Sequence, residues 1–271
     1  MDHADTETTR FRPPLPEREG IDIPPEAFET ISHILKKLKA FNLDIYKDKC
    51  IKRRIALRVR ATHCASALEY CDYLLRHEEE LDRLLKVLTI HVSQFFRNPP
   101  MYEKLRQEVI PYLFSLCRAE GRPGLTCWSV GCAGGEEPYS LALLLREAFA
   151  REMQQTPASI LATDVDEIVI GQARRGEFAA DRLLEVSAEM KVRWFSEKGG
   201  KFALAPEITA MVGFHQADLC DPAAFPASDL ILCRNVLIYF ERQQQEKIIT
   251  RFAEVLRPGG VLVLGKSETL F

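Results

Sequence analysis

The stretch LTCWSVGCAGGEEPYSLALLLREAF, residues 125–149, decides the fold of this chain. It begins with an apolar run typical of a buried strand and passes through a turn with three glycines. It then continues with apolar residues at helical spacing, and Pro138 suits the first turn of that helix. A strand, a glycine turn and a helix in this order predict the first unit of a parallel sheet wound with helices.

Further apolar runs repeat this rhythm along the chain, separated by segments with helical spacing such as residues 245–258. The runs are ASILATDVD (158–166), MVGFHQAD (211–218), SDLILCRNV (228–236) and GGVLVLGKSE (259–268). Alternating strands and helices predict an α/β fold with a Rossmann-like parallel sheet over residues 123–271. Residues 198–213, which include a pair of glycines, interrupt the rhythm, and we expect a small antiparallel insertion there.

The segment in front of the sheet has a different pattern. Residues 1–25 contain five prolines and many charges without a period, which predicts a flexible leader. Residues 26–92 carry apolar side chains at helical spacing and predict a small N-terminal all-helical domain. We expect residues 93–122 to form an interdomain linker and a helix.

The composition limits the class of protein. A length of 271 residues with 46% hydrophobic residues fits one large domain and one small domain. The net charge of −3 provides no global attraction to nucleic acid or to anionic membranes. No run approaches the roughly 18 to 20 apolar residues that a membrane span requires, and the eight cysteines form no C-x-x-C pair. We therefore expect a cytoplasmic protein without direct membrane insertion and without a metal.

Polar residues after the first two strands indicate the chemistry, because open α/β sheets bind ligands outside the carboxyl ends of their strands. Glu136 and Glu137 open the helix after the glycine turn, where a pyrophosphate would need bare N–H groups. This acidic pair disfavours an NAD-linked oxidoreductase and favours a cationic ligand, such as the amino group of a methionine moiety. Asp164 can accept the hydroxyls of a ribose, although it could instead cap the next helix, as we expect of Asp166.

Two further segments could reach the same ligand. Asn235, Val236 and Tyr239 follow the fourth strand and could line both a cofactor and a methyl acceptor, although Tyr239 could also be a core residue. Arg97 precedes a helix-breaking Asn-Pro pair between the two domains. Its guanidinium offers a planar fork for a carboxylate, either of the methyl donor or of an acidic substrate.

Four separated blocks resemble the chemotaxis receptor methyltransferases of the CheR type. The blocks are SQFFRNP (93–99), GCAGGEEPYSLA (131–142), ATDVDE (162–167) and CRNVLIYF (233–240). The resemblance extends over about residues 26–271 and implies a Rossmann-like S-adenosylmethionine-dependent methyltransferase sheet. It implies S-adenosylmethionine as donor and S-adenosylhomocysteine as product. The implied substrates are glutamate side chains of methyl-accepting chemotaxis proteins.

The same resemblance implies a set of site residues. The cofactor-binding residues would be His91, Ser93, Arg97, Glu137, Asp164, Asp218, Leu219, Asn235 and Val236. Within this set, Glu137 would bind the methionine amino group, Asp164 the ribose hydroxyls, and Asp218 and Leu219 the adenine. Arg97 and Tyr239 would be catalytic residues that face the methyl acceptor. His91 departs from the usual asparagine, although imidazole can still form hydrogen bonds.

Two other departures concern the edges of the fold. The 198–213 insertion looks shorter than in family members that bind a receptor's C-terminal pentapeptide, which leaves tethering open. The chain also stops after the fifth strand, where this fold normally adds two antiparallel strands. We therefore expect either a fragment of a longer protein or a sheet edge that something else completes.

Residues 47–60 form a strongly basic helical segment with the single acidic residue Asp48. This could be a solvated face, or Arg53, Arg54 and Arg58 could dock the acidic helices of a receptor. Interleaved aromatic residues that would stack on bases are missing, so we expect no nucleic-acid partner. The alternatives are a methyltransferase for another protein or an RNA, and a non-catalytic signalling module. The sequence does not predict the oligomeric state.

Overall fold

The computed structural model describes residues 21–39, 41–89 and 93–268, so most of the expected leader lies outside the described residues. The first part folds into helices, as expected: α1 (Pro25–Lys39), α2 (Asp48–Ala61), α3 (Ala67–Arg76) and α4 (Glu78–Leu88). Their apolar faces share one core, in which Leu35, Ile55 and Leu84 are fully buried. At the start of α3, the hydroxyl of Ser66 accepts the N–H of Glu69 at 3.1 Å, which is the first half of a capping box.

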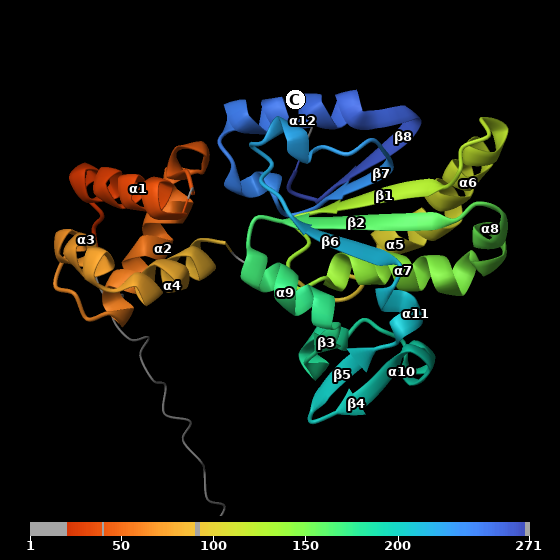
Figure 1. The fold of residues 1–271 in the computed structure, drawn as a ribbon, viewed down its shortest axis with the longest axis horizontal. Helices are drawn as coiled ribbons and strands as arrows, with labels where there is room; N and C mark the ends of the chain where they lie inside the picture. The colour runs from red at the N-terminus through yellow and green to blue at the C-terminus, as the bar shows by residue number, and fades with distance from the viewer. Residues whose placement is uncertain (1–20, 40, 90–92, 269–271) are drawn as a thin grey trace, which may run out of the picture.

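The second part is built on a parallel sheet whose order is β6-β2-β1-β7-β8. Its strands are β1 (Leu125–Val130), β2 (Ala158–Asp164), β6 (Val212–Gln216), β7 (Ser228–Cys233) and β8 (Leu256–Leu264). The five expected strands are therefore confirmed. The chain moves outward from β1 to β6 and restarts at β7 on the other side of β1 (Figure 1). Ligands of open α/β sheets bind where the strand order reverses in this way.

Helices cover both faces of this sheet. The helices of this part are α5 (Pro99–Lys104), α6 (Ile110–Ala119), α7 (Glu136–Ala148), α8 (Ala150–Gln155), α9 (Glu167–Arg175), α10 (Ala188–Trp194), α11 (Pro206–Thr209) and α12 (Arg242–Val255). Among them, α10 packs against a second, small antiparallel sheet. Successive side chains of β1 point to opposite faces. Cys127 packs in the core between the sheet and helices α6 and α7, whereas Trp128 packs against α12 on the other face. Figure 1 shows α12 above the sheet and α7 below it. Every helix of the described residues is too short or too polar to cross a lipid bilayer.

Two expected boundaries differ from the structure. Leu113 and Phe114 of α6 pack in the same core as β1, so this helix belongs to the sheet domain and not to a linker. The small antiparallel sheet has the order β3-β5-β4 and consists of β3 (Glu177–Phe178), β4 (Phe195–Lys198) and β5 (Lys201–Leu204). It therefore begins and ends earlier than the expected range of 198–213.

The glycine pair explains this difference. Gly199 and Gly200 both have positive φ angles, of 60° and 74°, and form the two-residue turn between β4 and β5. The pair is thus the tip of a hairpin, and one of the two strands precedes it. Val212 belongs to β6, where it pairs with Ile160 in the main sheet.

Candidate active site

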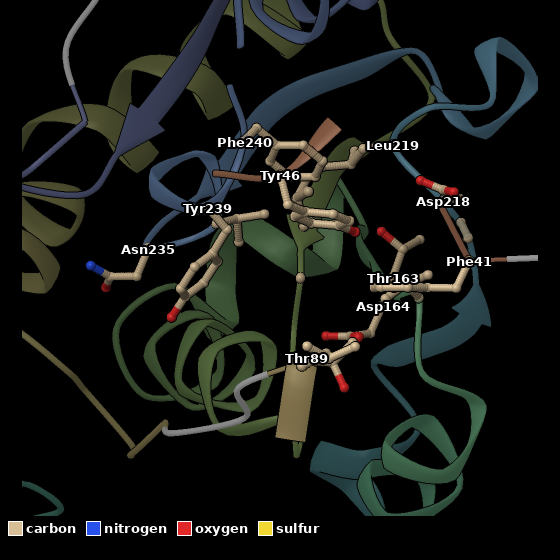
Figure 2. A pocket seen from close by; sticks show the side chains of 16 residues that line it. Phe41, Tyr46, Thr89, Thr163, Asp164, Asp218, Leu219, Asn235, Tyr239 and Phe240 are labelled. Atoms are coloured by element: carbon tan, nitrogen blue, oxygen red, sulfur yellow. The ribbon is translucent and has the colours of Figure 1, made fainter. Parts of the chain in front are cut away.

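A pocket opens at the carboxyl edge of the sheet, where the helical domain meets the loops after β1, β2, β6 and β7. Figure 2 shows Asp164 and Asp218 on one side of this pocket and Asn235 and Tyr239 on the other. A smaller pocket adjoins it and shares several of its residues. The smaller pocket is lined by Ser93, Arg97, Gly131, Cys132, Ala133, Glu137, Arg234, Asn235 and Tyr239.

The glycine turn after β1 contributes to both pockets, because Gly131 lines each of them. Gly131 has a φ of 62°, and a Cβ atom built on it would lie 2.5 Å from Cγ2 of Val236. Only glycine fits this position, because it tolerates the left-handed backbone and leaves room for the neighbouring loop. The N–H of Cys132 donates to the carbonyl of Thr163 at 2.9 Å, which ties the turn to the end of β2.

Glu137 is placed in the first turn of α7 and faces the smaller pocket. Its carboxylate accepts a hydrogen bond from the hydroxyl of Ser129 at 2.8 Å and forms an ion pair with the guanidinium of Arg234 at 3.1 Å. Burial raises the pKa of Glu137, and the charge of Arg234 and both hydrogen bonds oppose that rise. A nearly buried carboxylate of this kind gains from a second cationic partner, such as a primary ammonium group.

Asp164 ends β2 and connects two loops of the site. One of its oxygens accepts the N–H of Ala133 at 3.0 Å and the other accepts the N–H of Asp166 at 3.1 Å. A carboxylate at the end of a strand can accept the hydroxyl groups of a diol such as a ribose. Asp166 caps α9 by accepting the N–H groups of Ile168 and Val169, as its position after the strand predicted.

Aromatic side chains close the opposite end of the larger pocket. The ring of Tyr46 stacks between Phe41 and Phe240, with centroid distances of 5.3 and 4.9 Å. Burial raises the pKa of Tyr46, and the nearby charge of Asp218 adds to this, so its phenol stays protonated. Leu219, which is also buried, lines the same pocket. A flat aromatic ligand with polar edges suits this end.

The loop after β7 brings Asn235, Val236 and Tyr239 to the pocket. Asn235 adopts a left-handed conformation with a φ of 61°. The following N–H groups are accepted by the carboxylate of Glu268, which the sequence did not single out. Glu268 carries no local signal, because its partners in this loop lie about thirty residues away in the chain.

The segment between the domains contributes Ser93 and Arg97, which line the smaller pocket with Glu137. The carbonyl of Arg97 accepts a hydrogen bond from Arg234 at 2.7 Å. The predicted cofactor contact of His91 lies outside the described residues. Apart from His91, the structure brings all predicted cofactor and catalytic residues together around the two adjoining pockets.

Of the three arginines predicted to dock a receptor, Arg54 and Arg58 form contacts within the protein, and only the burial of Arg54 contradicts its predicted role. Arg58 forms a two-point hydrogen-bonded pair with Glu80, at 2.8 and 2.7 Å, inside the helical domain. Arg54 is buried, donates to the carbonyl of Leu88, and lies with its guanidinium 4.9 Å from the ring centroid of Tyr239. Helical periodicity locates the basic face but does not reveal that α4 and the Tyr239 loop cover part of it. Arg53 is exposed.

Several contacts hold the helical domain against the loop after β7. Tyr46 and Phe240 form an isolated antiparallel bridge, and the ammonium of Lys47 donates to the carbonyl of Ile238 at 2.9 Å. The backbone N–H of Lys47 donates to the carbonyl of Tyr239 at 2.9 Å. Both domains therefore shape the pocket, and sequence reasoning missed the share that Phe41, Tyr46 and Thr89 contribute.

The residues present fit S-adenosylmethionine. The close approach at Gly131 leaves a backbone cradle that a Cβ atom would fill, and the carboxylates of Glu137 and Asp164 suit an ammonium and a ribose. The aromatic end near Tyr46 suits an adenine. In the described part of the chain, no three His, Cys, Asp or Glu side chains are grouped to hold a metal ion.

Comparison with known proteins agrees with this geometry. Residues 26–89 match the family model for the CheR methyltransferase all-alpha domain, and residues 91–271 match that for the CheR methyltransferase SAM binding domain. The chain is 33% identical to a chemotaxis protein methyltransferase of Listeria monocytogenes, with 88% of each chain covered. It is 36% identical to chemotaxis protein methyltransferase 1 of Pseudomonas aeruginosa, with 70% of each chain covered.

A longer relative is an uncharacterized 104.1 kDa protein of Rhodobacter capsulatus. It is 34% identical over 91% of this chain, but the chain spans only 26% of that protein. The two family models together cover nearly all of the residues that form the helical domain and the sheet domain. The chain therefore belongs to the CheR methyltransferase family and is an S-adenosylmethionine-dependent methyltransferase.

Proposed function

We propose that this chain transfers a methyl group from S-adenosylmethionine to glutamate side-chain carboxylates of chemoreceptors. The products would be glutamate methyl esters, formed during chemosensory adaptation. One observation carries the proposal: the nearly buried pair of Glu137 and Arg234 lines the same small pocket as Arg97 and Tyr239. An anchor for the amino-acid end of the donor therefore adjoins a cationic side chain that suits an acidic acceptor.

The donor would be held by residues at or after the ends of three strands, β1, β2 and β6. Glu137 would bind its ammonium group, Asp164 its ribose hydroxyls, and Asp218 and Leu219 its adenine end. When bound, S-adenosylmethionine supplies an electrophilic methyl group on a sulfonium. The two pockets share Gly131, so a ligand that occupies both runs past the glycine turn.

The acceptor needs little chemical activation. A glutamate side chain has a reference pKa of about 4.3 and is already an anionic nucleophile at neutral pH. The tasks of the protein are therefore alignment and exclusion of water, rather than removal of a proton. Arg97 would orient the incoming carboxylate with its planar fork, and Tyr239 would shape the channel to the methyl group.

The partner would be the acidic methylation helices of a chemoreceptor, with exposed Arg53 as one docking residue. We infer that the reaction occurs in the cytoplasm, because all eight cysteines are free thiols, as is usual in a reducing compartment. Two relatives are named chemotaxis protein methyltransferases, which supports this class of partner.

The test is methyl transfer from radiolabelled S-adenosylmethionine to purified cytoplasmic fragments of candidate receptors. We expect base-labile label, as esters give, and mass mapping should locate it on glutamates. Label on RNA, or base-stable label on another protein, would support a different methyltransferase. Binding of S-adenosylhomocysteine without any transfer would support a signalling module.

Arg97→Ala examines the acceptor side of the site. We expect roughly a hundredfold lower turnover on receptor and an unchanged melting temperature, because a charge-assisted contact to the acceptor is lost. Arg146→Ala on α7 is the matched control, since Arg146 is exposed. Full activity of Arg97→Ala would remove the proposed role of Arg97.

A further inference from the structure

The carboxylate of Glu268 is surrounded by backbone N–H groups from two loops of the sheet edge. One oxygen accepts the N–H groups of Val236 and Leu237, both at 2.8 Å. The other accepts those of Asn235 at 2.9 Å and Gly265 at 2.6 Å. The residue is 9% exposed, so it is largely shielded from water. Four hydrogen bonds use the full acceptor capacity of a carboxylate.

These bonds fix the start of the loop, whereas its later residues are also bonded to Gln245 and Lys47. Asn235 is left-handed, and the 3₁₀ turn Leu237–Tyr239 that follows has no side-chain cap of its own. A non-glycine residue persists in a left-handed conformation only where its surroundings hold it there. The carboxylate of Glu268 supplies that restraint, because it binds the N–H groups on both sides of the Asn235 to Val236 peptide.

The approach of the two loops is close enough to require glycine. A Cβ atom on Gly265 would lie 2.5 Å from the Glu268 carboxylate and 3.0 Å from the backbone nitrogen of Asn235. Val236, one residue further on, is the side chain that faces the cradle at Gly131. A shift of the Glu268 carboxylate would therefore move Val236, which packs against Gly131 in the wall of the pocket.

We propose that Glu268 is a positioning residue of this site, which holds the 235–237 backbone so that Asn235, Val236 and Tyr239 face the bound nucleoside. It does not line either pocket itself and acts through the backbone of the loop. The inference rests on the proposed function for the identity of the nucleoside, but the restraint on the loop is a property of the free protein.

The experiment uses Glu268→Gln in the full chain. A glutamine keeps one acceptor oxygen but turns an NH₂ group toward two backbone N–H groups, which cannot accept it. We expect affinity for S-adenosylhomocysteine, measured by calorimetry on folded protein, to fall roughly tenfold, because buried donors lose their acceptor. Amide hydrogen exchange should accelerate at residues 235–237 and remain unchanged in β1.

The matched control is Asp229→Asn, which alters another buried carboxylate at the opposite end of β7. Asp229 accepts the N–H of Thr126 and contacts Arg122 and Arg257, none of which lines the pockets. We expect this variant to melt at a lower temperature and to bind S-adenosylhomocysteine within twofold of the unaltered protein. A merely structural role for Glu268 would give the same pattern as Asp229→Asn and would overturn the proposal.

Gly265→Ala provides a second route if Glu268→Gln does not fold, because its methyl group displaces the carboxylate without removing it. It should also weaken binding and accelerate exchange at residues 235–237. If the unaltered protein does not bind S-adenosylhomocysteine, the proposed function fails, and the exchange measurement still decides the role of Glu268. Unchanged exchange at residues 235–237 in both variants would overturn that role.

Discussion

The carboxylates at the amino ends of the parallel strands, here called the amino edge of the sheet, are paired differently from those at the carboxyl ends, the carboxyl edge. At the amino edge, Asp229 faces two cations, Arg122 and Arg257, in addition to a backbone N–H. At the carboxyl edge, the described residues that line the two pockets include three carboxylates and two arginines. These residues are Glu137, Asp164, Asp218, Arg97 and Arg234. Because Arg122 also pairs with Glu120 at 2.5 Å, two carboxylates balance two arginines at the amino edge. The charged residues that line the two pockets instead carry one more negative than positive charge, which suits a cationic ligand.

The largest effect should come from breaking the balanced edge. Asp229→Asn removes the fully buried carboxylate that pairs with Arg122 and Arg257, and leaves Arg122 with the exposed Glu120. We expect the free energy of unfolding, measured in urea, to fall by about 3 kcal/mol. Affinity for S-adenosylhomocysteine should stay the same at a temperature where the protein is folded. A large loss of affinity would contradict the division between a structural edge and a binding edge.

At the other edge, Asp164→Ala should cost binding more than stability. It removes the acceptor proposed for the ribose hydroxyls and the bonds to the backbone of Ala133 and Asp166. We expect affinity for S-adenosylhomocysteine to fall about a hundredfold, as loss of buried hydrogen bonds to a charged group implies. Asp166→Asn is the control, because asparagine caps a helix as well as aspartate does. Equal losses in both variants would mean that the carboxylates of this loop act only on its folding.

The carboxyl edge could be predicted largely from the sequence, because each of its loops follows a strand that periodicity locates. Asp164 was recognised in this way, at the end of an apolar run, and Glu137 was recognised from its place at the start of the helix after the glycine turn. Glu268 and Tyr46 were not, because their partners lie far along the chain. The sheet order brings Glu268 to the loop after β7, whereas the packing of the helical domain brings Tyr46 to Phe240. The pairing of Arg58 was missed for the same reason, since Glu80 comes from another helix.

Glu137→Gln removes a charge from the binding edge and keeps its shape. We expect affinity for S-adenosylhomocysteine to fall about tenfold, because a charge-assisted hydrogen bond to the ammonium is replaced by a neutral one. Arg234 would lose its partner as well, so the melting temperature should be followed in parallel. Glu246→Gln, at an exposed position on α12, is the control. Unchanged affinity would assign the ammonium to another group.

The same residue predicts a pH dependence. Burial raises the pKa of Glu137 in the folded protein, so its carboxylate takes up a proton at a higher pH than an exposed glutamate would. Affinity for the ammonium should therefore fall as the pH is lowered through this raised pKa, above the reference value of about 4.3. The contribution of Glu137 to stability has the opposite sign: it decreases as the pH rises from the unfolded to the folded pKa. In Glu137→Gln, both dependences should disappear.

The smallest effect should separate two neighbouring arginines of α2. Arg54 stacks on Tyr239 and is buried, whereas Arg53 is exposed. Arg54→Ala should lower the kcat of receptor methylation roughly threefold, since a cation–π contact of this size restrains the Tyr239 ring. Arg53→Ala should instead raise the KM for receptor, more strongly at low salt, because an exposed charge acts through screened attraction. If Arg54→Ala changed only the KM, with the same salt dependence as Arg53→Ala, Arg54 would act on receptor binding together with Arg53. It would then have no effect on catalysis through Tyr239.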